Sequence, residues 1–430
     1  MFFNIVALLK KRIQKLVQTG FFPIVITSFL VKVVAFVGGA VLVRVLTKSD
    51  YGLYSYVSNS RNMLMLIGDM GCSVAAMQFC NEAHNNPKKR NAYYLLGFWS
   101  ALGFSLLGSI FMLTSPLFYP YQLEHAAEYV MMLCFLPILV GIYNMLQINL
   151  RVQLRNRRYS VLGAVYAAVH YAVILPTAFF FGVKGALLSE YITYFAAIIV
   201  ALLLNKRLID WRGGTTLITK PERSQFYKFA FASQANNTLD FFLMQMDIFC
   251  IGLFFPVQDI IASYKVATVI PTALLFIPNA IMTYAGPYFV RKNQDKAWIC
   301  TQYNRLIGYS ALLHGIIAVG LIIFAPWILP FIFGAQYADA VLCFRILIIG
   351  YFFSATIRVP SSNVIYTQRK LRVNLALTIV AGVVKIVLDI FLIQWWASVG
   401  AAITTMLVNI LVSVISLIYM KYIYLKKEEA

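Results

Sequence analysis

Ionisable side chains interrupt the long apolar stretches of this sequence, and their chemistry is the first clue to what the chain does. They are Lys32, Arg61, Asp69, Glu190, Asp240, Asp247, Lys265, Arg345, Arg358, Lys385 and Asp389, together with His170 and His314. A charge at the centre of a bilayer is costly, so such a residue usually faces a partner or a water-filled cavity. Cations outnumber acids in this set. A cavity lined by them would have a positive potential and would attract an anion with a large polar head, such as a phosphate.

Four of these cations are difficult to neutralise, and we expect them to contact an anionic substrate. They are Lys32, Arg61, Arg345 and Arg358. Lys32 lies about 11 residues into its apolar stretch, which places it roughly 16 Å from the end of a helix that begins at Phe21. At that depth its ammonium cannot easily reach either interface.

Two acids near the expected middle of the membrane are candidates for ion coupling. Asp69 and Asp240 could titrate or bind a cation there. Asn236, Asn237 and Asp240 also share one face of a helix, because their spacing matches the helical period. This polar patch is consistent with a water-filled lumen.

For other members of the set a structural role is the simpler interpretation. Lys385 and Asp389 are four residues apart and could pair on one helix. Asp247 and Lys265 flank the same turn and could pair across it. We expect the two histidines to be hydrogen-bonded core residues.

Composition defines the class of protein. Apolar residues make up 61% of the chain, charged residues only 12%, and the mean hydropathy is +0.76. This is more apolar surface than a soluble core could hide, so the chain is predicted to be an integral membrane protein. The net charge of +20 would suggest a nucleic-acid partner in a soluble protein, but the cations gather in one set of loops and we expect no nucleic acid.

No enzyme signature accompanies these charges. The sequence contains no nucleotide-binding loop, no metal-ligand spacing and no nucleophile–base pair of a known kind. We therefore expect neither an enzyme nor a cofactor or metal. The six cysteines lie in or beside apolar stretches, and we expect them to pack as small apolar residues without disulfides.

Hydropathy predicts an all-α, polytopic membrane protein with twelve transmembrane helices. The first span follows Phe21 without a cleavage site, so we expect it to be retained. The spans are expected at 21–43, 56–80, 92–115, 129–150, 160–181, 184–204, 226–254, 261–290, 303–329, 341–367, 373–395 and 398–422.

The distribution of cations supports this topology. With the N-terminus in the cytoplasm, 27 of the 36 Lys and Arg fall in the inside loops and at the two ends. The outside loops hold Lys48 and Lys184, with Arg44 at a helix end. Cytoplasmic loops retain such cations, so both termini are predicted to be cytoplasmic.

The chain is expected to divide into two six-helix bundles, at 21–204 and 226–422. A cytoplasmic linker at 205–225 would join them, with an amphipathic segment at 1–20 and a cytoplasmic tail at 423–430. The halves echo one another at an offset of 215 residues, at Gly185 and Gly400 and at Arg155 and Lys370. Such repeats would be related by a pseudo-two-fold axis along the membrane normal.

Several segments of this sequence resemble those of a known family. Lys32, the turn RVLTKSDYGLYS at 44–55, Gly71, the turn QLRNRRY at 153–159 and the helix starts at Gly182, Gly185 and Gly400 are similar to polysaccharide flippases. Those O-antigen and lipid-linked oligosaccharide flippases belong to the multidrug/oligosaccharidyl-lipid/polysaccharide exporter (MOP) superfamily. The similarity extends over the whole chain.

This resemblance implies two bundles in a V around a central cavity, as in multidrug and toxin extrusion (MATE) transporters. It also implies that the chain moves an undecaprenyl-diphosphate-linked oligosaccharide, as in O-antigen and lipopolysaccharide biosynthesis, to the outer leaflet of a bacterial inner membrane by alternating access. H⁺ or Na⁺ would be the coupling ion, and a glycan polymerase and a chain-length regulator would be partner proteins. Lys32 and the arginines would then hold the diphosphate.

Two alternatives remain. A multidrug antiporter of the same superfamily would export organic cations, which require an acidic and aromatic cavity rather than an excess of cations. A polysaccharide polymerase would act on the same lipid-linked glycan, but such enzymes usually carry a sizeable outside loop, and no outside loop here exceeds about a dozen residues by the hydropathy reading.

Overall fold

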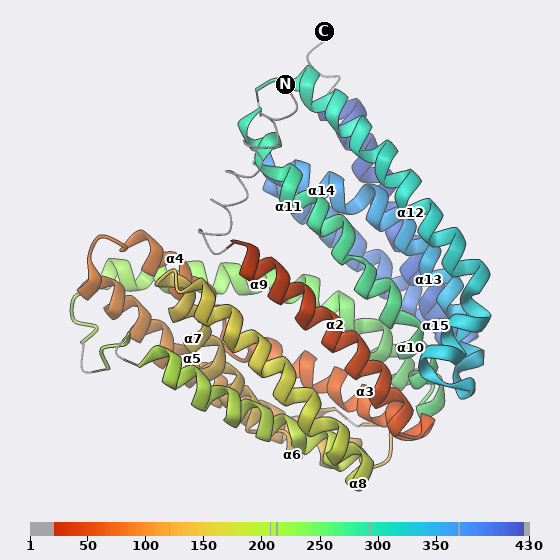
Figure 1. Ribbon diagram of the computed structural model, residues 1–430, viewed down its shortest axis with the longest axis horizontal. Helices are drawn as coiled ribbons and strands as arrows, with labels where there is room; N and C mark the ends of the chain where they lie inside the picture. Colours follow the sequence, from red (N-terminus) through yellow and green to blue (C-terminus); the bar gives the residue numbers. More distant parts are fainter. Residues whose placement is uncertain are drawn as a thin grey trace, which may run out of the picture. The chain divides into compact units, whose positions relative to one another are not determined.

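The computed structural model describes residues 21–424 apart from 120, 207, 212–213, 293 and 369. Every regular element in that part of the chain is helical, which confirms the expected all-α class (Figure 1). The amphipathic segment expected at 1–20 and most of the tail expected at 423–430 lie outside the described residues.

Contacts group the helices into two compact units. Unit 1 holds residues 21–46 and 60–238, and unit 2 holds residues 47–59 and those from 239 onward. The chain changes unit three times: once after Leu46, between two helices, and then inside α3 (Lys48–Leu64) and inside α9 (Lys220–Phe254). The two-bundle division at 21–204 and 226–422, with a linker at 205–225, stays a prediction.

In the described part of the chain, unit 1 contains seven elements in full, together with parts of α3 and α9. Its elements are α2 (Phe21–Val45), the turn η1 (Met65–Ile67), α4 (Cys72–Glu82), α5 (Pro87–Phe118), α6 (Ala126–Met132), α7 (Leu136–Val152) and α8 (Asn156–Asn205). Helix α8 packs on α2 and α7, and α5 packs on α4 and α7. Local sequence explains the start of α5, because the side chain of Asn86 accepts the backbone N–H of Lys89 at 3.1 Å and Pro87 occupies the first turn.

Unit 2 has a comparable set of elements. They are α10 (Gln258–Leu274), α11 (Phe276–Arg291), α12 (Lys296–Phe333), η2 (Ala335–Ala340), α13 (Val341–Phe353), the π-helical turn η3 (Ser354–Arg358), α14 (Val359–Thr367), α15 (Leu371–Ile418) and η4 (Tyr419–Tyr424). Helix α13 packs on α10, α12 and α15, and α11 packs on α14.

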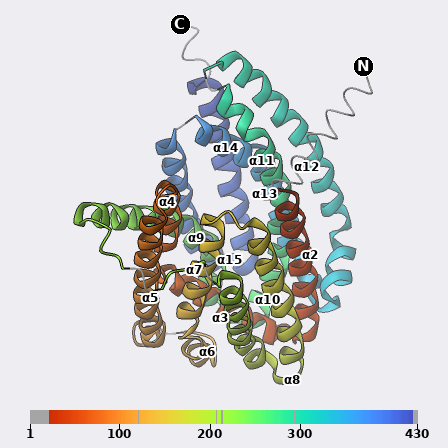
Figure 2. The same cartoon turned by 60° about the vertical axis from the view of Figure 1, so that its left-hand side comes forward.

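The two longest helices, α8 and α15, each double back on themselves (Figure 1 and Figure 2). The backbone leaves helical geometry at Gly182 (φ 57°, ψ −140°) in α8 and at Ala397 (φ 46°, ψ −125°) in α15. Residues on either side of each break lie together: the rings of Tyr166 and Tyr194 are 5.3 Å apart, and Lys385 bonds Thr405. Each is therefore a hairpin of two antiparallel helices.

The two hairpins repeat at the offset predicted from the sequence. The breaks at 182 and 397 are 215 residues apart, and so are the first residues of α8 and α15, Asn156 and Leu371. The preceding helices end alike as well, because Gln153 caps α7 with φ −88° and ψ 9° and Gln368 caps α14 with φ −86° and ψ 10°. This recurrence of local geometry supports an internal duplication.

The membrane-spanning character of the chain is evident in its helices. Within the described residues, six helical segments are long and apolar enough to cross a membrane, and a bent pair, α6 with α7, would make up to seven. Two of the six are the hairpins α8 and α15, with 50 and 48 residues. Each hairpin contains two of the predicted spans, and the total of twelve stays a prediction.

A glycine closes each hairpin because no side chain fits there. A Cβ on Gly185 would overlap the carbonyl oxygen of Thr177, and a Cβ on Gly400 would overlap that of Leu392. The clash is with backbone, which cannot move away without opening the hairpin.

We therefore expect Gly185→Ala and Gly400→Ala each to lower the stability of the purified protein by about 1–3 kcal/mol, because the two helices must separate. Gly320→Ala is the matched control, since nothing lies within 4 Å of a Cβ built there. That change should be neutral or stabilising by about 0.5–1 kcal/mol. Thermal unfolding followed by tryptophan fluorescence measures all three. Equal effects at the three glycines would contradict the close packing of the hairpins.

Candidate functional site

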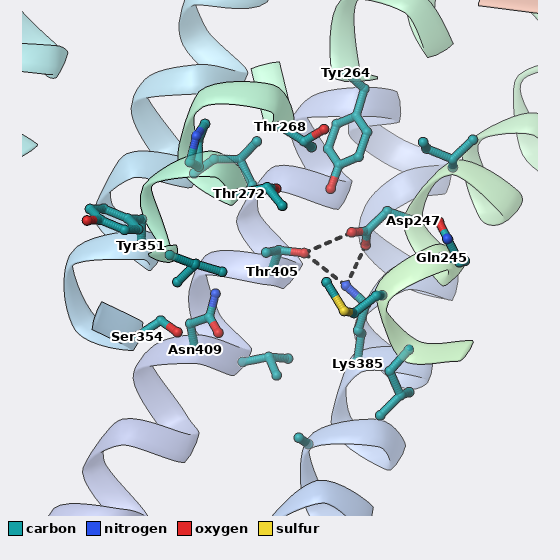
Figure 3. Close-up of a pocket in the computed structure, with 18 of the residues that line it drawn as sticks. Gln245, Asp247, Tyr264, Thr268, Thr272, Tyr351, Ser354, Lys385, Thr405 and Asn409 are labelled. Carbon is teal, nitrogen blue, oxygen red and sulfur yellow. Dashed lines mark hydrogen bonds and ion pairs between the residues drawn. The ribbon is translucent and has the colours of Figure 1, made fainter. Parts of the chain in front are cut away.

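A cavity of about 390 Å³, lined by apolar and charged side chains, lies inside unit 2 (Figure 3). Its walls come from α9, α10, α13, η3 and α15. The charged side chains that line it are Asp247, Lys265, Arg358 and Lys385. Three cations against one carboxylate give the cavity a positive potential.

A buried ion pair forms one wall of this cavity. The Nζ of Lys385 donates to Oδ1 of Asp247 at 2.6 Å and to Oγ1 of Thr405 at 2.9 Å, and that hydroxyl donates to Oδ2 of Asp247 at 3.1 Å (Figure 3). Asp247 and Lys385 are 8% and 7% exposed. The closed ring of three bonds satisfies both charges, which a buried ion pair needs if it is to persist.

This geometry corrects two of the pairings predicted from the sequence. Lys385 does not pair with Asp389 one turn along its helix, and Asp247 does not pair with Lys265 across the turn. The long lysine side chain reaches the carboxylate of Asp247 on α9 and the hydroxyl of Thr405 on the second half of α15, which together provide more acceptors than Asp389 alone. Asp389 is fully buried, and neither of its carboxylate oxygens makes a hydrogen bond in the described part of the chain.

Two further cations face the cavity from other elements. Arg358 ends the π-helical turn η3 and donates from Nη1 to Oδ1 of Asn409 at 2.8 Å. Single π-turns inside helices are frequent at functional sites. Lys265 of α10 is half-buried, and its ammonium makes no hydrogen bond or ion pair within the residues that the structure describes. Sequence reasoning placed Lys265 in a structural pair and so missed it as a cavity cation.

Arg345 and Lys32 lie elsewhere. The Nε of Arg345 donates to the backbone oxygen of Ile322 on α12 at 3.0 Å, and Arg345 is not among the residues that line the cavity. Lys32 is on α2 in unit 1, with an exposed side chain. Of the four cations predicted to contact substrate, only Arg358 lines the cavity in unit 2.

Unit 1 has its own buried polar cluster. Arg61 forms an ion pair with Glu190, which is 7% exposed, and also donates to Oδ1 of Asn62 at 2.9 Å. His170 stacks on Tyr166 with ring centroids 6.0 Å apart, on the same hairpin as Glu190. His170 and Glu190 are each 215 residues before Lys385 and Thr405, so the two clusters occupy equivalent positions of the repeat.

Of the two acids predicted for ion coupling, the structure describes the side chain of Asp69 but not that of Asp240. The carboxylate of Asp69 accepts the backbone N–H of Gly71 at 3.1 Å and that of Ser73 at 3.3 Å, where Met70 and Gly71 have positive φ. It thus caps the break before α4, as short acidic side chains do at helix starts. Asp240 lies in α9, but its side chain is outside the described residues.

The remaining sequence expectations concern neutral residues. His314 is fully buried and bonds the backbone oxygen of Ser310 at 2.8 Å through Nδ1, which confirms it as a hydrogen-bonded core residue. The six cysteines are all free, and five of them are buried.

A family model and several solved structures match this chain. The model of the family described as polysaccharide biosynthesis protein matches residues 41–342. A multidrug resistance MATE transporter of the MOP superfamily, in an inward-facing conformation, aligns with a TM-score of 0.75 and 14% identity over 93% of this chain and 96% of that one. The lipid II flippase MurJ, in an inward closed conformation, aligns with a TM-score of 0.67 and 12% identity over 92% and 86%.

A third structure is a MOP superfamily transporter from Pyrococcus furiosus, described as having a binding pocket of reverse polarity. It aligns with a TM-score of 0.58 and 13% identity over 93% of each chain. No curated protein matches this chain. The family match covers most of the chain, and at these identities the solved structures show a shared fold.

Replacing Lys385 with Met should destabilise the protein by about 3–5 kcal/mol, because Asp247 would keep a buried charge without its cation. Lys48→Met provides the comparison. Lys48 pairs with Asp339 at 2.7 Å in the same unit, but Asp339 is 56% exposed, so the loss there should be about 1 kcal/mol or less. Thermal unfolding of the two purified variants gives the difference. Equal losses would mean that the Lys385 pair is no better shielded than the Lys48 pair.

Proposed function

Because this chain belongs to the family of polysaccharide biosynthesis proteins, we propose that it is a flippase for an undecaprenyl-diphosphate-linked oligosaccharide, such as an O-antigen repeat unit. It moves the head group from the cytoplasmic to the outer leaflet of a bacterial inner membrane by alternating access. The lipid tail never has to leave the hydrocarbon, so only the diphosphate and the sugars need a polar path.

The observation that carries this proposal is the charge of the cavity in unit 2. Lys265 and Arg358 face it, while the charge of Lys385 is balanced by Asp247. The lining thus holds three cations against one carboxylate. This excess of positive charge suits a diphosphate, which accepts several charge-assisted hydrogen bonds. The cavity also carries neutral donors such as Ser354, which suit a sugar.

The substrate contacts proposed from the sequence are Lys32, Arg61, Arg345 and Arg358. Arg358 lines the cavity, and Lys32 has an exposed head. Arg61 pairs with Glu190, so its contribution to an anion site would be reduced by that carboxylate. Lys265 joins the proposed contacts on the strength of its position.

A multidrug or organic-cation antiporter is the second candidate, favoured by the structural likeness to MATE transporters. An organic cation would need uncompensated carboxylates or a bare aromatic wall. The cavity in unit 2 has one carboxylate, Asp247, and that group is bonded to Lys385. Charge repulsion therefore favours the anionic substrate over the cationic one.

The proposal includes an orientation and an ion. Both termini lie in the cytoplasm, as the positions of Lys and Arg predict. Asp69 and Asp240 are the proposed residues for coupling transport to H⁺ or Na⁺. A glycan polymerase and a chain-length regulator would act on the exported unit.

Lys32→Ala should leave the protein in the membrane but abolish surface glycan, because the diphosphate would lose a cation that a neutral side chain cannot replace. Lipid-linked oligosaccharide should then accumulate on the cytoplasmic leaflet, as in a deletion strain. Lys32→Arg should restore part of the export. Immunoblotting of membranes and of surface glycan in a complemented deletion strain measures both.

Lys184→Ala is the control for that experiment, since Lys184 is an exposed lysine beside the corner of the α8 hairpin. It should export normally. Normal export by Lys32→Ala would remove Lys32 from the proposed site, and unlinked single repeat units outside the deletion strain would point to a polymerase instead.

Asp240→Asn should change how export depends on pH or on sodium if Asp240 couples an ion, because the amide can neither titrate nor carry charge. Export assayed over a range of external pH and sodium concentration tests this. An unchanged dependence would assign Asp240 a structural role.

A further inference from the structure

A second carboxylate lies beside the buried ion pair of unit 2. Asp389 is on α15, one turn after Lys385, and its side chain is 0% exposed. Neither oxygen makes a hydrogen bond in the described part of the chain. An ionised carboxylate in such a place would carry the full cost of burial without a compensating partner.

The two carboxylates of this cluster outnumber its one ammonium, so the cluster could accept one more positive charge. The cluster contains two carboxylates, Asp247 and Asp389, but the ammonium of Lys385 gives its short bonds to Asp247 and Thr405. One cation therefore serves two acids. Keeping two like charges ionised in a shared low-dielectric site with one cation is costly, which favours proton uptake by one of the acids. The acid without a partner is Asp389.

We propose that Asp389 is a proton-binding site of this transporter, and that Lys385 exchanges its carboxylate partner from Asp247 to Asp389 when the proton is lost. The proton leaves the Asp389 carboxyl for water, and the carboxylate that remains attracts the ammonium four residues away on the same helix. No covalent bond other than O–H changes. This inference rests on the proposed function and deepens it, because it adds a proton site at Asp389 to the ion-coupling candidates Asp69 and Asp240.

The groups that act on Asp389 come from each neighbouring element. Asp247 and Cys250 lie on α9, Tyr264 on α10, and Lys385 on the same helix half. Thr404, from the second half of the hairpin, also lies near, although neither its hydroxyl nor the carboxylate makes a hydrogen bond of ordinary geometry in the described chain. Among these groups only Asp247 is a second acid of similar strength.

A proton fits this site better than a metal cation. A sodium ion needs several oxygen ligands around it, whereas the space between Asp247 and Thr405 already holds the ammonium of Lys385. The described residues contain no group of three or more His, Cys, Asp or Glu that could hold a metal. A proton needs only one carboxylate oxygen.

The exchange would change the cavity itself. Asp247, Thr405 and Lys385 line it, whereas Asp389 is not among the lining residues. When Lys385 turns to Asp389, the carboxylate of Asp247 is left facing the cavity without its cation. The cavity then holds an anionic diphosphate less tightly, so proton loss and substrate release are linked.

Infrared difference spectroscopy of the full chain in lipid nanodiscs tests the site directly. The wild type should show the C=O stretch of a protonated carboxylic acid that disappears as pH rises. Asp389→Asn should lack this band, and it should fold normally because the amide has nearly the shape of the neutral acid. Asp339→Asn, which alters an exposed acid of the same unit, should keep the band.

A second variant tests the exchange of partners. Asp247→Asn releases Lys385 to pair with Asp389, so the band should disappear at a proton concentration about tenfold higher or more. A titrating band that survives in Asp389→Asn, no band in the wild type, or no shift in Asp247→Asn would each overturn the proposal. Loss of the band on adding sodium chloride at constant pH would overturn the assignment to a proton.

This test separates the proton site from the flippase. A fluorescent undecaprenyl-diphosphate disaccharide in proteoliposomes measures flipping by the wild type. Flipping without a titrating band would overturn the proton site and leave the flippase standing. A titrating band without flipping would support the proton site while the proposed function failed.

Discussion

A charge buried in a membrane protein must find a partner of opposite sign, and the contact between Lys385 and Asp247 is where this chain meets that requirement. The pair joins α9 to α15 inside unit 2, and Thr405 closes the ring from the other half of the hairpin. Because this ring balances one cation, the positive charge that remains at the cavity comes from Lys265 and Arg358. The net charge at the cavity thus depends on which carboxylate Lys385 is bonded to.

The same arrangement occurs twice in one chain. Each half has a helix hairpin that turns at a residue with positive φ, Gly182 or Ala397, and each hairpin carries a buried polar cluster. In unit 1 the cluster contains Glu190 paired with Arg61. The geometry of the hairpins is conserved between the halves, but the charges within them are not. A duplicated scaffold can therefore keep its packing while the two halves acquire different ionic roles.

The sequence predicted the helical class, the hairpin glycines and the offset of 215 because those features depend on local patterns. Asp69 could have been recognised as a cap too, since an acid placed just before a helix start has a known local role. The partner of Lys385 could not be found this way. An i, i+4 neighbour was available, but the contact that forms is with Asp247, 138 residues away. That choice depends on how the helices pack, which no local pattern contains.

The turn of the second hairpin has an alanine where the turn of the first has a glycine. Position 182 is glycine, which adopts a positive φ without penalty, whereas the matching position 397 is alanine, whose Cβ makes the same conformation unfavourable by about 1–3 kcal/mol. The contacts between the two halves of α15 must therefore offset this conformational energy for the hairpin to stay closed. The hydrogen bond from Lys385 to Thr405 is one of the contacts that join the two halves. If the bond between Lys385 and Thr405 breaks, separation of the two halves would relieve the unfavourable backbone conformation at Ala397. A change of charge at Lys385 therefore acts on a strained hairpin, whereas the corner of the first hairpin is unstrained glycine.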